Sequence, residues 1–393
     1  MGEGLRQKRG RTLTIFLAIV VFTIIILVHE IGHFWAARRA GIEVIEFSLG
    51  MGPRLLKFTD KRGTMFSLKL FPIGGSCRFL AGDETDEEET EGEGAEGAIV
   101  VKPEKVRELS PNSFNAKPVR WRMLVILGGA LANFIFAFLV ATIISMFNAH
   151  AEPNILGFTE GSPAAASGMM EGDRILRMDG RRIVTRGDVN LAMMSADGSP
   201  MEIIVRRDGE RIPLTLNPMF HETEQRWMLG IFFTRAVGVF MDAPEGAYER
   251  RMGFFESFQH GYQTVGFYIR ATFTGLGRLI RYGLNFDELM GPIGIVDTVG
   301  GQIADAYTHE HGGAGAAIWT MLSFTVLLSA NLGVMNLLPI PALDGGHMVF
   351  LIIEAIRKKP VPPERMGLIN LAGIVLLMGF ILLVAFHDIM RFF

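Results

Sequence analysis

Apolar residues gather in four long stretches, at residues 13–37, 123–147, 314–338 and 366–386. Each stretch is long enough to cross the hydrocarbon core of a bilayer, which takes about 20 helical residues. The first follows a basic N-terminal segment but precedes no small-residue cleavage site, so we expect it to stay as an anchor. With four spans, both ends of the chain lie on the same side of the membrane.

A different pattern begins the loop between the first two spans. Residues 47–80 are rich in glycine and contain the alternating run Met65-Phe66-Ser67-Leu68-Lys69-Leu70, which predicts a small β-sheet. Its edge could bind an extended peptide as an added strand. The residues expected at that contact are Ser67, Lys69, Gly74 and Gly75. The alternative is an ordinary cytoplasmic hairpin.

The segment between the second and third spans holds a further domain. Residues 154–218 carry the pattern SPAA…G…GDxI…DG, which resembles bacterial PDZ domains, and Leu229-Gly230-Ile231 is expected to supply one returning strand. Such a domain either adds a peptide to its sheet edge or acts as a steric gate. We favour the gate.

An amphipathic pattern precedes the third span. From Phe254 to Ile280, apolar residues recur at intervals of three or four, with arginines interspersed. This spacing predicts a helix that lies on the membrane surface.

Composition agrees with a membrane protein. The 393 residues are 49% hydrophobic, with a mean hydropathy of +0.31. The net charge of −3 and the lack of a basic stripe give no sign of nucleic-acid binding. The single cysteine, Cys77, excludes an intramolecular disulfide. Nine acidic residues among the 14 from Asp83 to Glu96 indicate a solvated linker.

His29-Glu30-Ile31-Gly32-His33 ends the first apolar stretch. On a helix, this HExxH spacing puts two imidazoles on one face, where both can bind one Zn²⁺, and puts the glutamate close enough to act as a general base. Ionisable side chains at lipid depth are costly and usually functional. The alternative is a chance match at the membrane interface, so a third ligand decides the matter.

A candidate third ligand lies near the end of the third span, in the run Asn336-Leu337-Leu338-Pro339-Ile340-Pro341-Ala342-Leu343-Asp344-Gly345-Gly346-His347. Two prolines break the helix there, and the freed backbone groups are tolerated in a membrane only beside protein or water. Asp344 then needs a partner, which a metal held by the two histidines would supply. Two histidines and one carboxylate leave a fourth position open, as in catalytic zinc sites. His347 is a weaker candidate.

Together these motifs resemble the site-2 protease family of intramembrane zinc metalloproteases, and most closely its bacterial RseP-type branch, which cleaves anti-sigma factors. Two further runs resemble that branch, Gly129-Ala130-Leu131-Ala132-Asn133-Phe134 and Gly291-Pro292-Ile293-Gly294-Ile295. The chain departs from the family at Ala130, where proline is usual, and in having room for one PDZ domain rather than two.

The resemblance implies that His29, His33 and Asp344 bind Zn²⁺ and that Glu30 is the general base. Asn336 and Asn133 are uncharged amides at lipid depth, suited to bind a developing oxyanion or an extended substrate backbone. Otherwise they join helices by hydrogen bonds. In the family, the β-rich region is a membrane-reentrant loop.

The expected function is that of an intramembrane zinc endopeptidase. Its substrates would be single-span membrane proteins, such as anti-sigma factors after an upstream cleavage, or signal-peptide remnants. Two alternatives are a transporter and a PDZ-containing membrane adaptor without peptidase activity. The HExxH motif and the lack of an internal repeat argue against the transporter, and the four intact site residues argue against the adaptor.

Charge gives the expected orientation in the cell inner membrane. Residues 38–122 carry 14 Lys and Arg, against four ahead of the first span, so the positive-inside rule places this loop in the cytoplasm. The PDZ-like domain and both termini are then extracytoplasmic, and the active site lies towards the cytoplasmic side.

The predicted fold is an α-helical polytopic membrane protein with four transmembrane helices, a membrane-associated β-hairpin or sheet region and an inserted PDZ-like α+β domain. The expected segments are a first span with HExxH (1–38), a reentrant β-region (39–82), a charged loop (83–122), a second span (123–148), the PDZ-like domain with its returning strand (154–232), an amphipathic helix and the GPI run Gly291-Pro292-Ile293 (250–313), a third span with the LDG motif Leu343-Asp344-Gly345 (314–356) and a fourth span (366–388).

Overall fold

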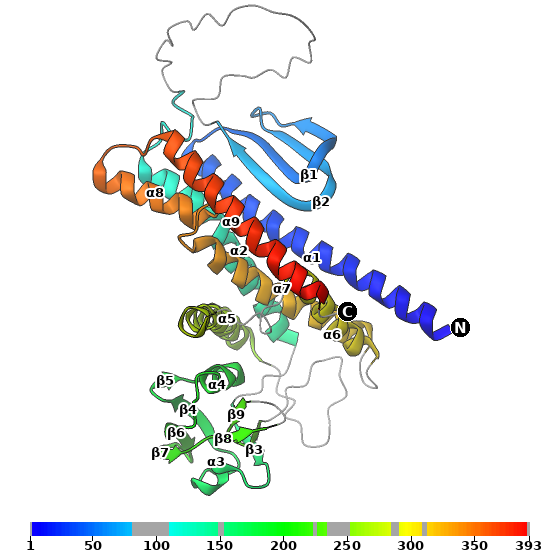
Figure 1. The fold of residues 1–393 in the computed structure, drawn as a ribbon, viewed down its shortest axis with the longest axis vertical. Coiled ribbons are helices and arrows are strands. Elements are labelled where there is room, and N and C mark those ends of the chain that lie inside the picture. Colours follow the sequence, from blue (N-terminus) through cyan, green and yellow to red (C-terminus); the bar gives the residue numbers. More distant parts are fainter. Residues whose placement is uncertain are drawn as a thin grey trace, which may run out of the picture. The chain divides into compact units, whose positions relative to one another are not determined.

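The computed structural model describes residues 2–80, 110–147, 153–222, 226–233, 252–283, 291–308 and 313–390. The acidic run at 83–96 therefore lies outside the described residues. Within the described part, four helices are long and apolar enough to cross a membrane (Figure 1). They agree with the four spans predicted from the sequence. They are Leu17–Ala40 within α1 (Gly2–Ala40), α2 (Val119–Phe147), α7 (Ala314–Leu337) and α9 (Pro363–Met390).

The surface of α9 shows the environment that these helices require. Leu368 and Leu376 are each 70% exposed, and Val375 is 64% exposed. A continuous apolar surface of this kind is unusual in water, whereas lipid chains would cover it.

The chain divides into two compact units. One unit comprises residues 19–133 and 332–382, and the other comprises residues 1–18, 134–331 and 383–393. All residues of the predicted metal site belong to the first of these units.

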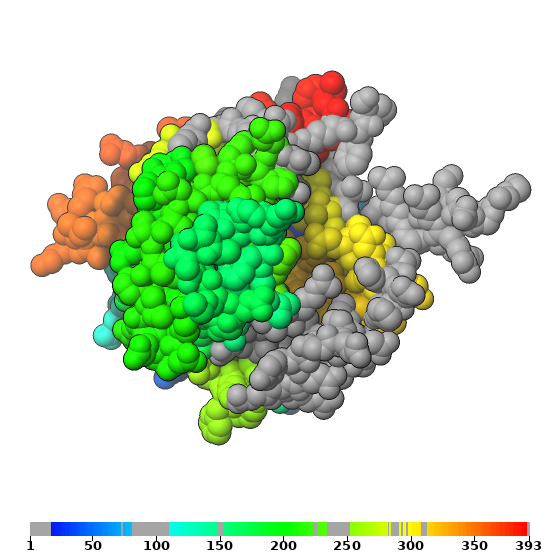
Figure 2. Space-filling model, turned by 90° about the horizontal axis from the view of Figure 1, so that it is seen from below, coloured from blue at the N-terminus to red at the C-terminus, as the bar shows by residue number. Residues whose placement is uncertain are grey.

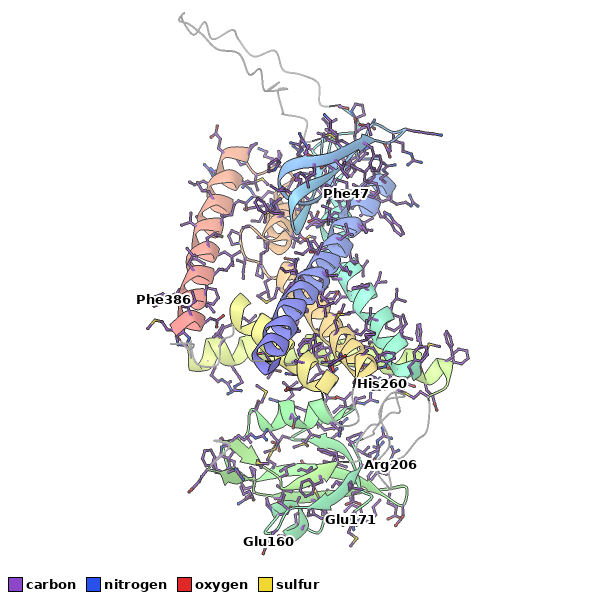
Figure 3. The ribbon with its side chains drawn as sticks, turned by 90° about the vertical axis from the view of Figure 1, so that its right-hand side faces the viewer. Phe47, Glu160, Glu171, Arg206, His260 and Phe386 are labelled. Atoms are coloured by element: carbon purple, nitrogen blue, oxygen red, sulfur yellow. The ribbon has the colours of Figure 1, made fainter. Side chains whose placement is uncertain are left out.

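In that unit, β1 (Val44–Thr59) and β2 (Met65–Phe79) form one antiparallel sheet. Both strands bend, so that each pairs twice: Phe47, labelled in Figure 3, lies opposite both Cys77 and Phe66. The order of the paired segments is therefore 75–79, 44–49, 65–71, 51–59. Gly50 and Gly52 allow the bend in β1, because their φ angles of +87° and +90° are unfavourable for other residues.

A short helix follows the proline-broken end of α7. The helix α8 (Asp344–Arg357) begins at the predicted third ligand. Gly346 is required just after it, because a Cβ there would lie 2.5 Å from the Ile340 carbonyl oxygen. The two prolines thus end one helix, and the glycines let the next begin against the turn between them.

The second unit contains the PDZ-like part, whose outer surface is green in Figure 2. Its core is apolar, with Ile175, Met178, Ile203 and Val205 fully buried. Its elements are β3 (Ile155–Phe158), α3 (Pro163–Ala166), β4 (Arg174–Met178), β5 (Arg181–Arg182), α4 (Arg186–Met193), β6 (Met201–Arg207), β7 (Glu210–Leu216), β8 (Met219–His221), β9 (Arg226–Met228) and β10 (Ile231–Phe233). One sheet has the order β5-β4-β6-β7, and β10 pairs with β3, so the last of these strands returns to the start of the domain.

The amphipathic pattern forms α5 (Phe254–Tyr282), which contacts both the PDZ-like part and α2. Arg270 donates a hydrogen bond to Asp188 of α4 at 2.7 Å. Nearer its start lies His260, labelled in Figure 3. Its Nδ1 is 2.7 Å from Ser145 Oγ of α2. Phe255 and Tyr262 remain 84% and 71% exposed, as expected for a helix at a membrane surface.

The GPI run begins α6 (Pro292–Thr308) and is bound by the last helix. The buried carboxylate of Asp388 in α9 accepts hydrogen bonds from the backbone N–H groups of Gly291 and Gly294, at 3.2 and 2.9 Å. These N–H groups have no partner within the helix. Asp388 therefore caps α6.

Candidate metal centre and peptidase site

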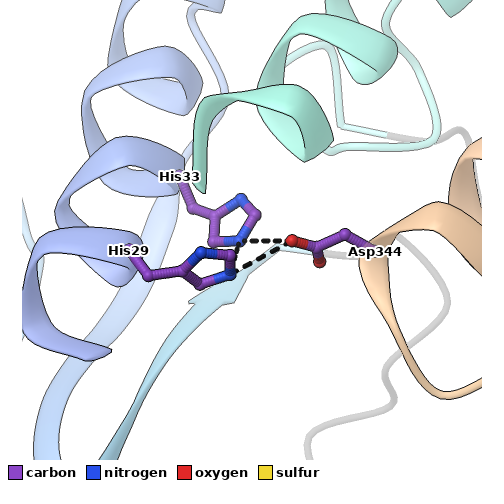
Figure 4. Close-up of side chains that lie close together, drawn as sticks. All are labelled: His29, His33 and Asp344. Carbon is purple, nitrogen blue, oxygen red and sulfur yellow. Dashed lines mark hydrogen bonds and ion pairs between the residues drawn. The ribbon is translucent and has the colours of Figure 1, made fainter. Parts of the chain in front are cut away.

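The helix α1 carries both histidines of the HExxH motif on one face. Their Nε2 atoms are 3.1 Å apart (Figure 4), and the two residues are only 7% and 8% exposed. A spacing of four residues puts side chains one above the other on a helix, which explains the approach.

Asp344 completes a three-atom cluster from the start of α8. Its Oδ2 lies 3.1 Å from His29 Nε2 and 3.3 Å from His33 Nε2 (Figure 4). In a tetrahedral zinc site with bonds of about 2.0–2.1 Å, ligand atoms lie about 3.3 Å from one another. The three atoms therefore have the mutual spacing that zinc requires.

Hydrogen bonding shows that His33 and Asp344 present acceptor atoms to the cluster. His33 Nδ1 lies 2.8 Å from the Val125 carbonyl oxygen, which can only accept, so Nδ1 carries the proton and the neutral ring keeps a lone pair on Nε2. That lone pair faces a carboxylate oxygen that is buried and has no hydrogen-bond donor. Lone pairs that meet at one buried point fit a metal cation. The hydrogen bond to Val125 fixes the orientation of the His33 ring, as the hydrogen-bond partners of metal-binding histidines commonly do.

Both predicted asparagines contact the His29 ring. The side-chain nitrogen of Asn133, which is fully buried, lies 3.3 Å from His29 Nδ1. The side-chain nitrogen of Asn336 lies 3.5 Å from Nδ1 and 3.4 Å from Nε2. An amide turned with its oxygen towards Nδ1 would accept that proton and leave Nε2 for a metal. This geometry suits Asn133 for orienting His29.

Glu30 lies against the end segment of β2. A Cβ at Gly75 would be 3.1 Å from Glu30 Cγ and 3.1 Å from the Ser48 carbonyl oxygen. The backbone N–H of Cys77 donates a hydrogen bond to the Glu30 carboxylate. The segment 75–79 is an outer one in the sheet, so this sheet edge and the candidate general base are neighbours.

The four predicted substrate-strand residues occupy different places in the sheet. Ser67 pairs with Ser48 on one side and Lys57 on the other, and Lys69 pairs with Arg54, so both lie on an inner segment. Gly75 begins the outer segment 75–79 of β2 and lies against Glu30, and Gly74 directly precedes it. Among the four, Gly75 is therefore the one that lies on an outer segment of the sheet.

Ser67 instead belongs to a cluster around Glu46 that holds the bent sheet together. Its Oγ donates to Glu46 Oε1 at 2.6 Å, and Arg54 and Arg78 donate to the same carboxylate. The hydrogen bond from Arg54 is the main cause that lowers the pKa of Glu46 to about 2. Because Glu46 stays ionised, the inner segments and the edge segment remain joined.

Sequence reasoning missed three glycines that bring α2 against the site. A Cβ at Gly129 would be 2.5 Å from His33 Nε2 and 2.7 Å from His29 Nε2. Gly32 and Gly128 face one another, and a Cβ at Gly128 would be 2.6 Å from the Gly32 carbonyl oxygen. A glycine pair in an apolar helix, together with a glycine inside HExxH, was the available signal of close helix packing.

Among the described residues, His29, His33 and Asp344 form the group able to hold a metal ion. His347 follows on α8, but it is not part of that group. The site thus consists of two helical histidines, one carboxylate and an adjacent glutamate, at the depth of membrane-spanning helices, and this arrangement defines a membrane metallopeptidase.

The comparison with protein families agrees. A model of peptidase family M50 matches residues 17–380, and the chain belongs to this family, that of the site-2 proteases. It is therefore a zinc metalloprotease of the membrane, and its expected cofactor is confirmed. The transporter and the adaptor without peptidase activity are set aside.

Several relatives are similar over nearly their whole length. Metalloprotease MmpA of Caulobacter vibrioides is 33% identical, over 95% of this chain and 94% of its own. Zinc metalloprotease RasP of Geobacillus kaustophilus is 29% identical, over 95% of this chain and 97% of its own. Regulator of sigma-W protease RasP of Bacillus subtilis is 27% identical, over 97% of this chain and 99% of its own. Over 21% of its length the chain is also similar to the PDZ domain of the SdrC-like protein from Listeria innocua, with 16% identity and a TM-score of 0.20.

Proposed function

We propose that this intramembrane protease holds zinc through His29, His33 and Asp344, uses Glu30 as its general base, and cleaves single-span membrane proteins. The observation that carries the proposal is the approach of the three ligand atoms to within 3.3 Å of one another. Two of these atoms belong to the membrane-spanning helix α1, and the third belongs to the first residue of α8.

Each residue then has a definite task. When bound, zinc lowers the pKa of water to about 7 and polarises the scissile carbonyl. Glu30 takes the proton from the attacking water and passes it to the leaving amine. Asn133 orients His29, and Asn336, which is only partly buried, donates to the developing oxyanion.

The substrate must be extended before it is cut, because a helix hides its peptide groups in internal hydrogen bonds. We propose that the opened segment adds to the edge of β2 at Gly74 and Gly75. Glu30 adjoins that edge, so an added strand would bring its peptide bond to the base.

Gly75→Ala is expected to lower the cleavage rate at least about tenfold while zinc content stays at the wild-type level. The added methyl would meet Glu30 Cγ at 3.1 Å, so it shifts the base or narrows the space for the strand. Kinetics and metal analysis of the purified protein measure both quantities.

Gly367→Ala in α9 is the matched control, because a Cβ there meets nothing within 4 Å, and its activity should equal that of the wild type. Wild-type activity in a folded Gly75→Ala protein would show that the edge of β2 does not take part.

The substrate class rests partly on a relative. The Bacillus subtilis relative is named regulator of sigma-W protease RasP. For this chain we propose substrates similar to anti-sigma factors, already trimmed by an upstream protease, or remnants of signal peptides. The proposed location is the inner membrane, with the site towards the cytoplasm and the PDZ-like part outside.

We further propose that the PDZ-like part excludes bulky substrates. Deleting residues 154–218 is expected to leave trimmed substrates cleaved near the wild-type rate and to admit substrates with intact outer domains. Cleavage assays with paired intact and trimmed substrates measure the effect. A folded deletion variant that is inactive on trimmed substrates would instead make this domain part of the catalytic machinery.

Substrate trapping tests the proposed function itself. The Glu30→Gln protein, expressed in native membranes, should accumulate single-span proteins, which mass spectrometry identifies by comparison with the wild type. If the accumulated proteins lack membrane spans, the proposed substrate class is wrong.

A further inference from the structure

A buried ion pair joins α2 to α8 away from the candidate metal centre. Arg122, near the start of α2, donates through Nη1 to Glu354 Oε2 at 3.0 Å and through Nη2 to Oε1. The two side chains are 9% and 15% exposed. Arg122 Nε also donates to the Lys117 carbonyl oxygen at 3.0 Å, so the guanidinium is held from two directions.

The candidate ligands come from two separate parts of the fold. His29 and His33 lie on α1, which is fixed to α2 by the Gly32–Gly128 contact and by the bond from His33 to Val125. Asp344 lies on α8, which follows the proline-broken segment. The position of α8 relative to α2 therefore decides whether the three ligand atoms come together.

We propose that the Arg122–Glu354 pair is a positioning device, which holds α8 against α2 so that Asp344 reaches the two histidines. The inference rests on the ligand set proposed above. Arg122 lies one helical turn before Val125, whose carbonyl fixes His33, so the pair connects the two halves of the ligand set by a short path.

A small rotation of α8 about its Glu354 end would displace Asp344, because the two residues are far apart along the helix. Glu354 lies ten residues after Asp344, which is about 15 Å along a helix. A rotation of α8 by about 4° about its Glu354 end would move Asp344 by about 1 Å over that length. Metal sites tolerate deviations of about 0.2 Å in ligand distance, so loss of the pair should first be felt in zinc retention.

The test measures zinc release from the full-length protein in detergent to a chelator, at a temperature well below unfolding. Glu354→Gln is expected to release zinc at least about tenfold faster than the wild type. The matched control is Asp60→Asn. Its partner Arg38 also lies on α1 but joins that helix to the turn after β1, so this variant should keep zinc like the wild type.

Arg122→Lys provides a second measurement if Glu354→Gln does not fold. Lysine keeps the charge but loses the two-pronged contact, so faster zinc release is again expected. Wild-type release in a folded variant of either kind overturns the inference, as does equally fast release from Asp60→Asn. Asp344→Ala distinguishes a failure of this inference from a failure of the proposed ligand set. If the ligand set is right, Asp344→Ala loses zinc, whatever the result for Glu354→Gln.

Discussion

Glu30→Gln is expected to slow cleavage by roughly 10²–10⁴-fold, the usual contribution of a general base, with zinc content unchanged. Glutamine keeps the shape of the side chain and can still accept the Cys77 hydrogen bond, but it cannot take a proton from water. The three proposed ligands are untouched. Single-turnover cleavage of a purified substrate and metal analysis of the same preparation measure both effects.

The parallel zinc measurement makes this prediction specific. If activity and zinc fall together, Glu30 supports the metal rather than the proton transfer. If a well-folded Glu30→Gln protein cleaves at the wild-type rate, another group must act as the base.

Asp344→Ala is expected to weaken zinc binding at least about 100-fold and to abolish cleavage. It removes one of three ligand atoms, a larger loss than the 10- to 100-fold typical of groups that only orient a ligand. Zinc stoichiometry after dialysis, together with a competition titration against a chelator, gives the affinity.

His347→Ala serves as the matched control on the same helix. It removes an imidazole three residues from Asp344 but outside the three-residue cluster, so its zinc content should equal that of the wild type. Normal stoichiometry in Asp344→Ala, or loss of zinc in His347→Ala, would place the third ligand elsewhere.

The metal centre could be predicted from the sequence because its signals are local. A spacing of four residues puts His29 and His33 on one helical face. Two prolines followed by Asp344 break a span and leave a carboxylate that needs a partner. The four membrane spans could be predicted just as directly from the four apolar stretches, because length and composition alone identify a spanning helix.

The order of the segments within the β-sheet could not be predicted from such local patterns. Alternation shows which side chains share a face, but it does not show which segment lies at an edge. Ser67 and Lys69 became inner residues because both strands bend and pair twice. The Arg122–Glu354 pair was also invisible, because its partners are 232 positions apart and each alone is typical of a helix end.

The contact between Gly32 and Gly128 limits how a substrate can arrive. A helix with its side chains is about 10 Å across, and it cannot pass between two helices whose backbones touch. At the level of these two glycines, α1 and α2 therefore leave no room for a substrate helix to enter between them. A bulkier residue at Gly128 would force the two helices apart, since its Cβ would meet the Gly32 carbonyl oxygen and the Ala36 side chain, at 2.6 and 3.0 Å. The same two glycines that bring the histidines close to α2 thus exclude a third helix from between α1 and α2 at that level.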